Sequence, residues 1–372
     1  MIARLALALV VAAPTVQPSV SDADRVMALG GGVAEVAVKF DQQHAGAVTV
    51  ASYPVDLQVN VFFGPASRLR GKLAAGDYLI WRWASVTKQV VATLVMQEVE
   101  KRRVDLDALA TKYLPDVALP GGDALTVRRL LNHTSGLYDP NSGPAGPDGT
   151  PLAYLRSKSP APKGIDPQCL KPSGRAPGEK FVYNNCDYVV LGALLERVSG
   201  KPFPQLVNER IAKPLGINSL RVLKPGDRDD IIGVDAKGAT DAGVDPGRYG
   251  TAANLAGTSN DLLAFDRALL ANKLLGPVAT AEMWRGDPKL GYAALGVWSY
   301  PVALKGCVTP QHIVERRGEV GNVQIRNLIA PERGIILIAF TATTATEFGE
   351  PWQGKGLTYE LLSAALCPEP AK

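Results

Sequence analysis

The sequence predicts an α/β fold in which both ends of the chain form one lobe and a helical lobe is inserted between them. β-type segments occur near the N-terminus and again near the C-terminus, whereas the stretch between them alternates short helical patterns with loops rich in Gly and Pro. We expect an α/β lobe at 24–103 and 287–372, a helical lobe at 104–286, and a ligand cleft where they meet.

The size and composition of the chain fit this organisation. Its 372 residues exceed what one hydrophobic core usually holds, so one large bilobal unit or two domains are expected. Hydrophobic residues make up 46% and charged residues 20%, which is ordinary for a globular protein. The formal net charge of +4 is spread without a basic run, so we expect no nucleic-acid partner.

The N-terminus has the pattern of a secretory signal peptide. Residues 1–4 are positively charged, 5–13 are apolar but too few to span a bilayer, and the segment up to 23 offers small residues for cleavage. We therefore predict a signal peptide at 1–23 and a periplasmic or secreted mature protein without a stable membrane span. A frayed apolar N-terminus is the alternative.

The cysteines and histidines indicate disulfides rather than a metal. An even count of cysteines fits an oxidising compartment. The four are Cys169, Cys186, Cys307 and Cys367. Three pairings are possible, and we favour the first with the second and the third with the fourth, because each such pair falls within one predicted lobe. The three histidines are scattered without metal-ligand spacing, so we expect neither a metal nor another cofactor.

Periodicity and turn signals predict the individual elements. The region from Val33 to about Leu73 has β-type segments, with Pro54 unable to occupy a central strand. Two apolar strands near the C-terminus are joined by a hairpin turn at 331–334. Helices are expected at 85–102, 126–133, 185–199, 204–213, 260–273 and 356–366. The segment 139–175 reads as a long surface loop, and such loops are often functional.

The tetrapeptide at 85–88 places a hydroxyl and an amine one helical turn apart, on Ser85 and Lys88. At about 3.6 residues per turn the two side chains share a face and can touch. A serine needs a neighbouring base to become a nucleophile, and burial favours the neutral lysine that can act as one. On this motif alone we favour a chance match, with Ser85 at a helix start and Lys88 exposed.

Two further segments carry polar residues that could reach the same cleft. Tyr183 and Asn185 stand at the start of a predicted helix, where a tyrosine can relay a proton and an asparagine can bond a lysine or a carbonyl. A helix cap beside a core tyrosine is the structural alternative. His133 could be a base, but we expect it to organise its turn, because no acidic residue stands where a Ser-His-Asp triad would need it.

Together these segments resemble the serine β-lactamase-related family, which includes class C β-lactamases, D-alanyl-D-alanine carboxypeptidases and related esterases. Six blocks that resemble family motifs follow one another in the family order, at 84–116, 125–137, 177–200, 214–217, 256–265 and 291–298. The resemblance implies a β-lactamase/transpeptidase-like fold, with an antiparallel sheet flanked by helices, an inserted helical lobe and the active site between the lobes.

The third catalytic block departs from the family pattern. Where the family has Lys-Thr-Gly or His-x-Gly, this sequence has Arg316, Arg317 and Gly318, which we predict to bind substrate. Strand alternation allows only one of the two arginines to face the cleft. An arginine there could clamp a carboxylate but cannot shuttle protons at neutral pH. Two surface arginines on an edge strand are the alternative.

The resemblance implies a serine hydrolase that forms an acyl-enzyme on a β-lactam, a D-Ala-D-Ala peptide or a short ester, that is, on a small-molecule or peptidoglycan-type substrate. Its catalytic residues would be Ser85, Lys88, Tyr183 and Asn185, and backbone N–H groups of Ser85 and Glu319 would form the oxyanion hole. The alternative is a penicillin-binding sensor on the same scaffold with little turnover. The sequence predicts no particular oligomeric state.

Overall fold

The structure is a computed structural model, and most of the chain is described by it. The described residues are 7–8, 30–37, 46–55, 57–63, 79–146, 149–157, 159, 164–178 and 180–367. The expected signal peptide at 1–23 lies almost entirely outside them and stays a prediction.

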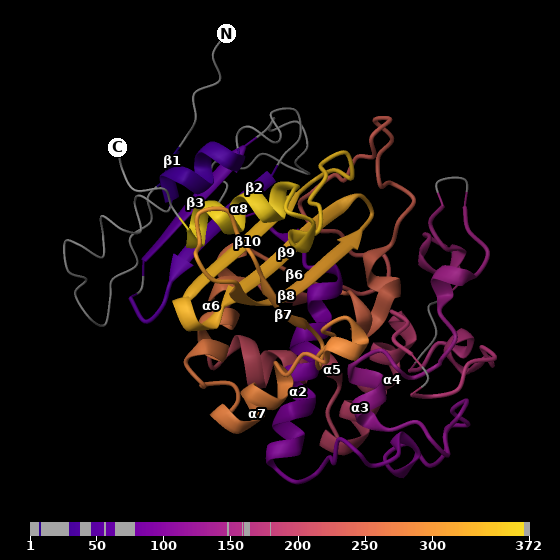
Figure 1. The fold of residues 1–372 in the computed structure, drawn as a ribbon. Helices are drawn as coiled ribbons and strands as arrows, with labels where there is room; N and C mark the ends of the chain where they lie inside the picture. The colour runs from indigo at the N-terminus through magenta and orange to yellow at the C-terminus, as the bar shows by residue number, and fades with distance from the viewer. Residues whose placement is uncertain are drawn as a thin grey trace.

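A seven-stranded antiparallel sheet forms the centre of the molecule (Figure 1). Its strands run in the order β1-β3-β2-β10-β9-β8-β7. They are β1 (Leu7–Ala8), β2 (Gly46–Ser52), β3 (Leu57–Phe63), β7 (Trp298–Val302), β8 (Gln311–Val320), β9 (Val323–Ala330) and β10 (Ile335–Thr341). Pairing of β2 with β10 joins the two ends of the chain in one sheet, which confirms that prediction.

Turn residues place the strand boundaries. Pro54 lies in the turn between β2 and β3, outside the ladder, as its missing N–H requires. The turn between β9 and β10 ends at Gly334, which has a φ of 59°. A Cβ atom built there would lie 2.1 Å from the carbonyl oxygen of Tyr53, so the turn requires glycine at this position.

One part of the expected N-terminal β region is wrong. Residues 30–37 form a helix, and Val33, Ala34 and Ala37 are buried in the core. The apolar residues of this segment fit a helical stripe as well as a strand, and so short a pattern does not distinguish the two.

The helices largely follow the sequence pattern. They are α2 (Thr87–Glu100), α3 (Val127–Leu131), α4 (Asn185–Ser199), α5 (Phe203–Val207), α6 (Ser259–Leu270), α7 (Pro277–Met283) and α8 (Leu357–Leu366). The expected helix at 204–213 is α5 continued by a π-helical turn at Asn208–Ala212. Neither α7 nor a small second sheet was predicted. That sheet consists of β4 (Trp81–Arg82), β5 (Arg221–Val222) and β6 (Leu255–Gly257).

Two hydrophobic cores lie on opposite faces of the large sheet. One packs the 30–37 helix and α8 against it, and the other packs α2, α4 and α6. In Figure 1, α2, α3, α4, α5 and α7 gather below the sheet. An antiparallel sheet flanked by helices is therefore confirmed, while the boundaries of the two lobes stay a prediction.

Both favoured disulfides are present. Cys169 pairs with Cys186 and Cys307 pairs with Cys367, with Cα atoms 5.2 and 5.1 Å apart. Disulfides persist in oxidising compartments, which indicates a location outside the cytoplasm. None of the helices in the described ranges combines the length and apolar character needed to cross a bilayer.

Candidate active site

Ser85 lies in a short turn that leads into α2. We expected the helix to begin at Ser85, but a 3₁₀ turn at Ala84–Val86 precedes α2, which begins at Thr87. Such turns are common at helix N-termini. The Thr87 hydroxyl accepts a hydrogen bond of 3.1 Å from the backbone N–H of Leu255, which fastens the turn to β6.

Lys88 is fully buried and bonds to the nucleophile candidate. Its Nζ donates to the Oγ of Ser85 at 3.1 Å, to the Oδ1 of Asn185 at 2.8 Å and to the carbonyl oxygen of Ala252 at 3.0 Å. A neutral amine has two N–H bonds and one lone pair. Asn185 and Ala252 can hold the two N–H bonds, which leaves the lone pair for the proton of Ser85.

Tyr183 approaches Ser85 from the other side. Its hydroxyl donates to the Oγ of Ser85 at 2.7 Å. Asn184 directly follows and caps α4, because its side chain accepts from the backbone N–H of Cys186 at 2.7 Å. The cap therefore fixes the start of α4, with Tyr183 just before it and Asn185 as its first residue. The helix cap that the sequence offered as the structural alternative is formed by Asn184.

The two arginines of the third block face opposite sides of β8. Arg316 is 2% exposed, and it donates to the Tyr183 hydroxyl at 2.7 Å and to the Ser85 carbonyl oxygen at 2.8 Å. Arg317 instead forms ion pairs with Glu315 and Glu350. Only one of the two arginines thus faces Ser85, as strand alternation requires, and Arg316 bonds within the cluster around Ser85. The substrate-binding roles expected for these arginines stay predictions.

Gly318 allows β8 to pass directly beside the nucleophile. A Cβ atom built at this position would lie 2.7 Å from the backbone nitrogen of Ser85. Only glycine therefore fits without movement of the turn or the strand. The next residue, Glu319, is exposed and lines the cavity in front of Ser85.

Burial and nearby charges shift the pKa values of Lys88 and Tyr183, the two candidates for proton transfer. Burial lowers the pKa of Lys88 to about 8, and Arg316 adds to this effect while Tyr183 opposes it. For Tyr183, burial alone would raise the pKa, but the charges of Arg316 and Lys88 outweigh burial and lower it. The cluster thus brings an amine and a phenol towards the pH range in which both can exchange protons.

His133 is buried and packs against Tyr183 and Asp187. Its Nδ1 lies 2.8 Å from the Oδ2 of Asp187, and its ring centroid lies 4.6 Å from that of Tyr183. The His133 backbone has a φ of 60°, and its carbonyl oxygen accepts from the N–H of Val182 at 2.8 Å. These contacts agree with the expected role of His133 in organising the turn.

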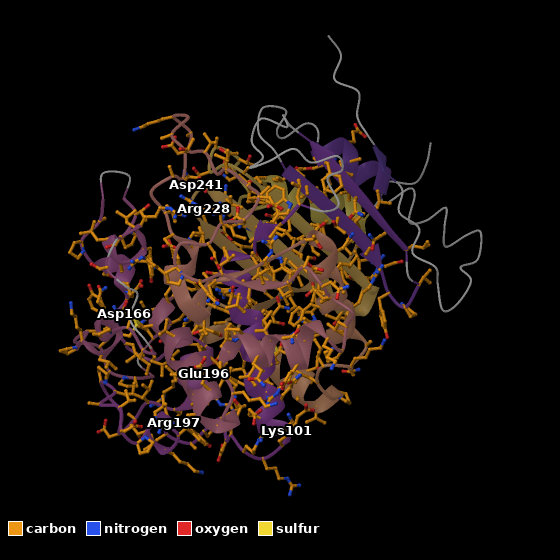
Figure 2. All side chains as sticks on the ribbon, turned by 180° about the vertical axis from the view of Figure 1, so that it is seen from behind. Lys101, Asp166, Glu196, Arg197, Arg228 and Asp241 are labelled. Atoms are coloured by element: carbon orange, nitrogen blue, oxygen red, sulfur yellow. A yellow bond between two sulfur atoms is a disulfide. The ribbon has the colours of Figure 1, made fainter. Side chains whose placement is uncertain are left out.

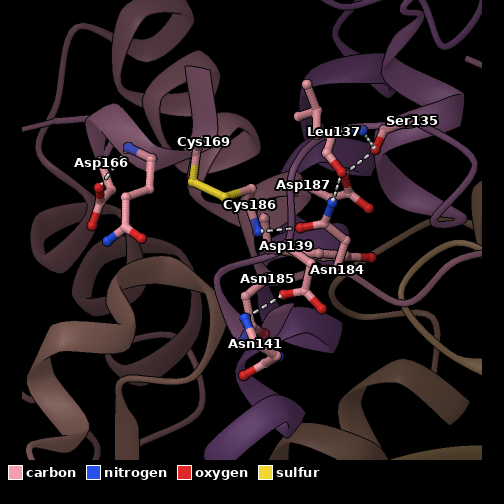
Figure 3. Close-up of a disulfide and its surroundings, with 12 residues drawn as sticks. Ser135, Leu137, Asp139, Asn141, Asp166, Cys169, Asn184, Asn185, Cys186 and Asp187 are labelled. Carbon is pink, nitrogen blue, oxygen red and sulfur yellow. Dashed lines mark hydrogen bonds between the residues drawn. A yellow bond between two sulfur atoms is a disulfide. The ribbon is translucent and has the colours of Figure 1, made fainter. Parts of the chain in front are cut away.

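The long loop forms one wall of the cavity. A space of about 490 Å³ opens in front of Ser85 and is bordered by loop residues that include Asn141, Thr150 and Pro151. In the same loop, Tyr154 accepts a hydrogen bond of 3.1 Å from Asn185. Figure 3 shows how the Cys169–Cys186 disulfide ties this loop to the start of α4.

Sequence reasoning missed several residues around the cavity. Tyr154 stacks on Tyr249 with ring centroids 3.7 Å apart, and Trp298 stacks on Tyr183 at 6.3 Å. Asp235 and Thr240 also line the cavity. Trp298 ends the block at 291–298 but was not singled out there. The other residues lie in no recognised motif, and only the composition of the long loop pointed to its involvement.

A comparison with protein-family models matches residues 23–354 to the family described as Beta-lactamase. The chain belongs to the Beta-lactamase family. This confirms the resemblance, and since proteins of this fold include serine hydrolases, it supports the expected enzyme class.

Curated relatives cover part of the chain. The D-alanyl-D-alanine-carboxypeptidase/endopeptidase AmpH of Escherichia coli (strain K12) is 28% identical over 204 residues, which are 53% of this chain and 51% of AmpH. The putative penicillin-binding protein PbpX of Bacillus subtilis (strain 168) is 28% identical over 54% of this chain and 49% of PbpX. The matches thus span about half the length of these relatives.

Solved structures resemble nearly the whole chain. D-amino acid amidase from Ochrobactrum anthropi SV3 has a TM-score of 0.73 and 20% identity, covering 92% of this chain and 98% of that one. A D-stereospecific amidohydrolase from Streptomyces sp. has a TM-score of 0.71 and 22% identity, covering 92% and 99%. At these identities the likeness establishes the fold.

Proposed function

We propose that this chain is a hydrolase that works through an acyl-enzyme on Ser85. The observation that carries the proposal is the convergence of Lys88 and Tyr183 on the Ser85 hydroxyl, at the wall of a cavity large enough for a small molecule. A sensor that lacks turnover would not need two proton-transfer groups on its nucleophile, so the complete cluster favours hydrolysis.

In the first step the Ser85 oxygen attacks a carbonyl carbon of an ester, amide or lactam. The Ser85 proton passes to neutral Lys88 or through Tyr183, and a C–O bond forms to the enzyme as the carbonyl becomes an oxyanion. The backbone N–H groups of Ser85 and Glu319 stabilise that oxyanion. As the bond to the leaving group breaks, the same proton is delivered to the departing oxygen or nitrogen.

In the second step a water molecule attacks the acyl-enzyme. It gives one proton to the Lys88–Tyr183 pair and its oxygen to the acyl group. The ester bond to Ser85 then breaks, and the proton returns to the Ser85 oxygen. Asn185 positions Lys88 through their 2.8 Å hydrogen bond. Arg316 keeps both basic groups reactive by lowering the pKa of Lys88 and of Tyr183.

The substrates we propose are a β-lactam, a D-Ala-D-Ala peptide or a short ester. The names of AmpH and PbpX support a peptidoglycan-type substrate. A signal peptide at 1–23 and a periplasmic or secreted location would bring the enzyme to such a substrate, and the two disulfides support this location.

Hydrolysis of p-nitrophenyl acetate tests the proposal. The wild-type protein should release a burst of one p-nitrophenol per chain, followed by steady turnover, and Ser85→Ala should return release to the uncatalysed rate. A burst without turnover would instead identify the sensor. Undiminished turnover in a folded Ser85→Ala variant would refute the assignment of the nucleophile.

A further inference from the structure

The side-chain amide of Asn185 is bonded at both of its ends. Its Oδ1 accepts from the Nζ of Lys88 at 2.8 Å, and its Nδ2 donates to the hydroxyl of Tyr154 at 3.1 Å. An asparagine amide has an acceptor end and a donor end. If the donor end faced Lys88, its N–H would bond to the lone pair of the neutral amine. The orientation of this amide therefore decides whether that lone pair is left for the proton of Ser85.

Tyr154, which holds the donor end, is itself fixed in place. It is 5% exposed, and its ring stacks on that of Tyr249 with centroids 3.7 Å apart and planes inclined by 11°. Its carbonyl oxygen accepts from the backbone N–H of Asp245 at 2.9 Å. The next residue, Leu155, forms a β-bridge with Val244. The 244–249 segment thus fixes this part of the long loop and, with it, the Tyr154 hydroxyl.

Tyr154 differs from the other tyrosine of the site in its protonation. Burial raises the pKa of Tyr154 well above its ordinary value, so its hydroxyl stays neutral. Nearby positive charges instead lower the pKa of Tyr183, whose hydroxyl donates to Ser85 at 2.7 Å. Tyr154 reaches Asn185 rather than the nucleophile. It is therefore suited to hold a hydrogen bond and not to exchange a proton.

We infer that Tyr154 is a positioning residue, which holds the Asn185 amide with its carbonyl oxygen towards Lys88 and so keeps the lysine lone pair free for Ser85. A buried amide N–H without a partner is costly, so without the Tyr154 hydroxyl the amide would leave this place. The inference rests on the proposed acyl-enzyme function and adds a residue of the long loop to its proton-transfer site.

Tyr154→Phe tests the inference, because it removes the hydroxyl and keeps the ring that stacks on Tyr249. The measurement is the rate constant of the p-nitrophenol burst from p-nitrophenyl acetate, followed by stopped flow across pH. We expect the plateau of this rate constant to fall on the order of tenfold. Thermal melts should show that the variant is folded.

The pH profile distinguishes positioning from a general loosening of the wall. The Asn185 carbonyl oxygen stabilises the protonated form of Lys88, so its displacement should lower the pKa of Lys88 and move the rising limb to lower pH. A loosened wall that admits water would relieve the burial that lowers this pKa, and the limb would move to higher pH. A merely structural role of Tyr154 therefore predicts the opposite shift.

A double-mutant cycle tests whether Tyr154 acts through Asn185. Asn185→Ala should slow acylation by itself, and adding Tyr154→Phe to it should have no further effect. Tyr138→Phe is the matched control, because it removes a phenolic hydroxyl just before the same loop. Tyr138 lies beside Lys171, whose Nζ is 5.8 Å from its ring centroid, and it should keep the wild-type burst rate.

Failure of the inference is distinguishable from failure of the proposed function. If p-nitrophenyl acetate is not hydrolysed in a Ser85-dependent manner, the proposed function is wrong. If that ester is hydrolysed but Tyr154→Phe is acylated at the wild-type rate, only the positioning role is overturned. A limb that moves to higher pH, full additivity in the double variant, or an equal loss in Tyr138→Phe would also overturn it.

Discussion

Lys88 lies among groups that push its pKa in opposite directions. Burial and the Arg316 charge lower the pKa of Lys88, whereas Tyr183 and Asp187 raise it, and the result is about 8. Below that pH the amine is mostly protonated and cannot accept the Ser85 proton. At the scale of single residues, the proposed mechanism therefore depends on a buried arginine that touches the Ser85 carbonyl oxygen and the Tyr183 hydroxyl.

The pH dependence of acylation should report this balance. For a neutral ester, kcat/KM should rise as Lys88 loses its proton and level off above about 8. Arg316→Gln removes a positive charge that lowers the pKa of both Lys88 and Tyr183, so the rising limb should move to higher pH. A pH–rate profile checks this.

Arg316→Lys is the matched control. It keeps the positive charge, so the rising limb of its pH–rate profile should lie closer to the wild-type position. If the rising limb of the pH–rate profile stays in place or moves to lower pH in Arg316→Gln, Arg316 does not lower the pKa values of Lys88 and Tyr183.

Individual residues were predictable to different degrees. Helical spacing placed Ser85 and Lys88 within reach of each other, but the resemblance to the serine β-lactamase-related family singled them out, and it did the same for Tyr183 and Asn185. The role of Arg316 was not found, because charge type alone does not reveal whether a side chain is buried behind the nucleophile or open to substrate. Tyr154 was missed because it joins the site through a long loop without periodicity.

At the scale of elements, the site depends on how closely β8 passes the turn before α2. Its partner β7 pairs only as far as Glu315, so the last part of β8 is open on that side to the turn at Ala84–Val86. Close approach requires that Gly318 has no side chain, because its Cβ atom would meet both the Ser85 nitrogen and the Ala84 methyl group.

Gly318→Ala should therefore damage catalysis more than folding. A Cβ atom 2.7 Å from the Ser85 nitrogen must displace the turn or the strand. Since a misplacement of about 1 Å can cost on the order of 100-fold in rate, we expect kcat/KM to fall by about that factor. Steady-state kinetics beside a thermal melt measures both effects.

Gly31→Ala is the control substitution, because a Cβ atom at this helical position meets nothing within 4 Å. It should retain wild-type kinetics. Equal activity of Gly318→Ala and the wild-type protein would mean that the approach of β8 is not as tight as described.

Element boundaries were predictable where the sequence holds a stop signal. The predicted range of α4 matches, because Asn184 caps its start and Gly200 has the positive φ that ends it. The small sheet was missed, because β4, β5 and β6 have two or three residues each and are held by packing rather than by local propensity.

At the scale of the whole molecule, one buried arginine connects segments far apart in the sequence. Arg82 bonds Asp229 through Nε at 2.6 Å, pairs with Asp241 at 2.6 Å, and donates to the carbonyl oxygens of Val320 and Gly321. It thereby joins β4, the 229–241 segment and the turn after β8. Both of the latter border the cavity.

Arg82→Leu should destabilise the fold strongly. It would leave Asp229 and Asp241 buried without their cation, and breaking a buried ion pair in this way costs about 3–5 kcal/mol. Chemical denaturation measures the loss of unfolding free energy.

Arg197→Leu is the control, because it breaks an exposed ion pair with Asp116 and should show no measurable change in stability. Figure 2 shows Arg197 and Asp241 at opposite ends of the molecule. Equal stability of the two variants would contradict this account.

The overall architecture was more predictable than the substrate. Six ordered blocks and β segments at both ends of the chain were enough to indicate the fold. The lining of the cavity could not be foreseen, because its residues come from separate segments that meet only through packing.

Covalent trapping at Ser85 tests the central claim most directly. The wild-type protein is incubated with a fluorophosphonate, digested and sequenced by tandem mass spectrometry, beside a folded Ser85→Ala variant. We expect one adduct per chain, located on Ser85, and none on the variant. An adduct on another residue of the wild-type protein, or equal labelling of Ser85→Ala, would contradict the account.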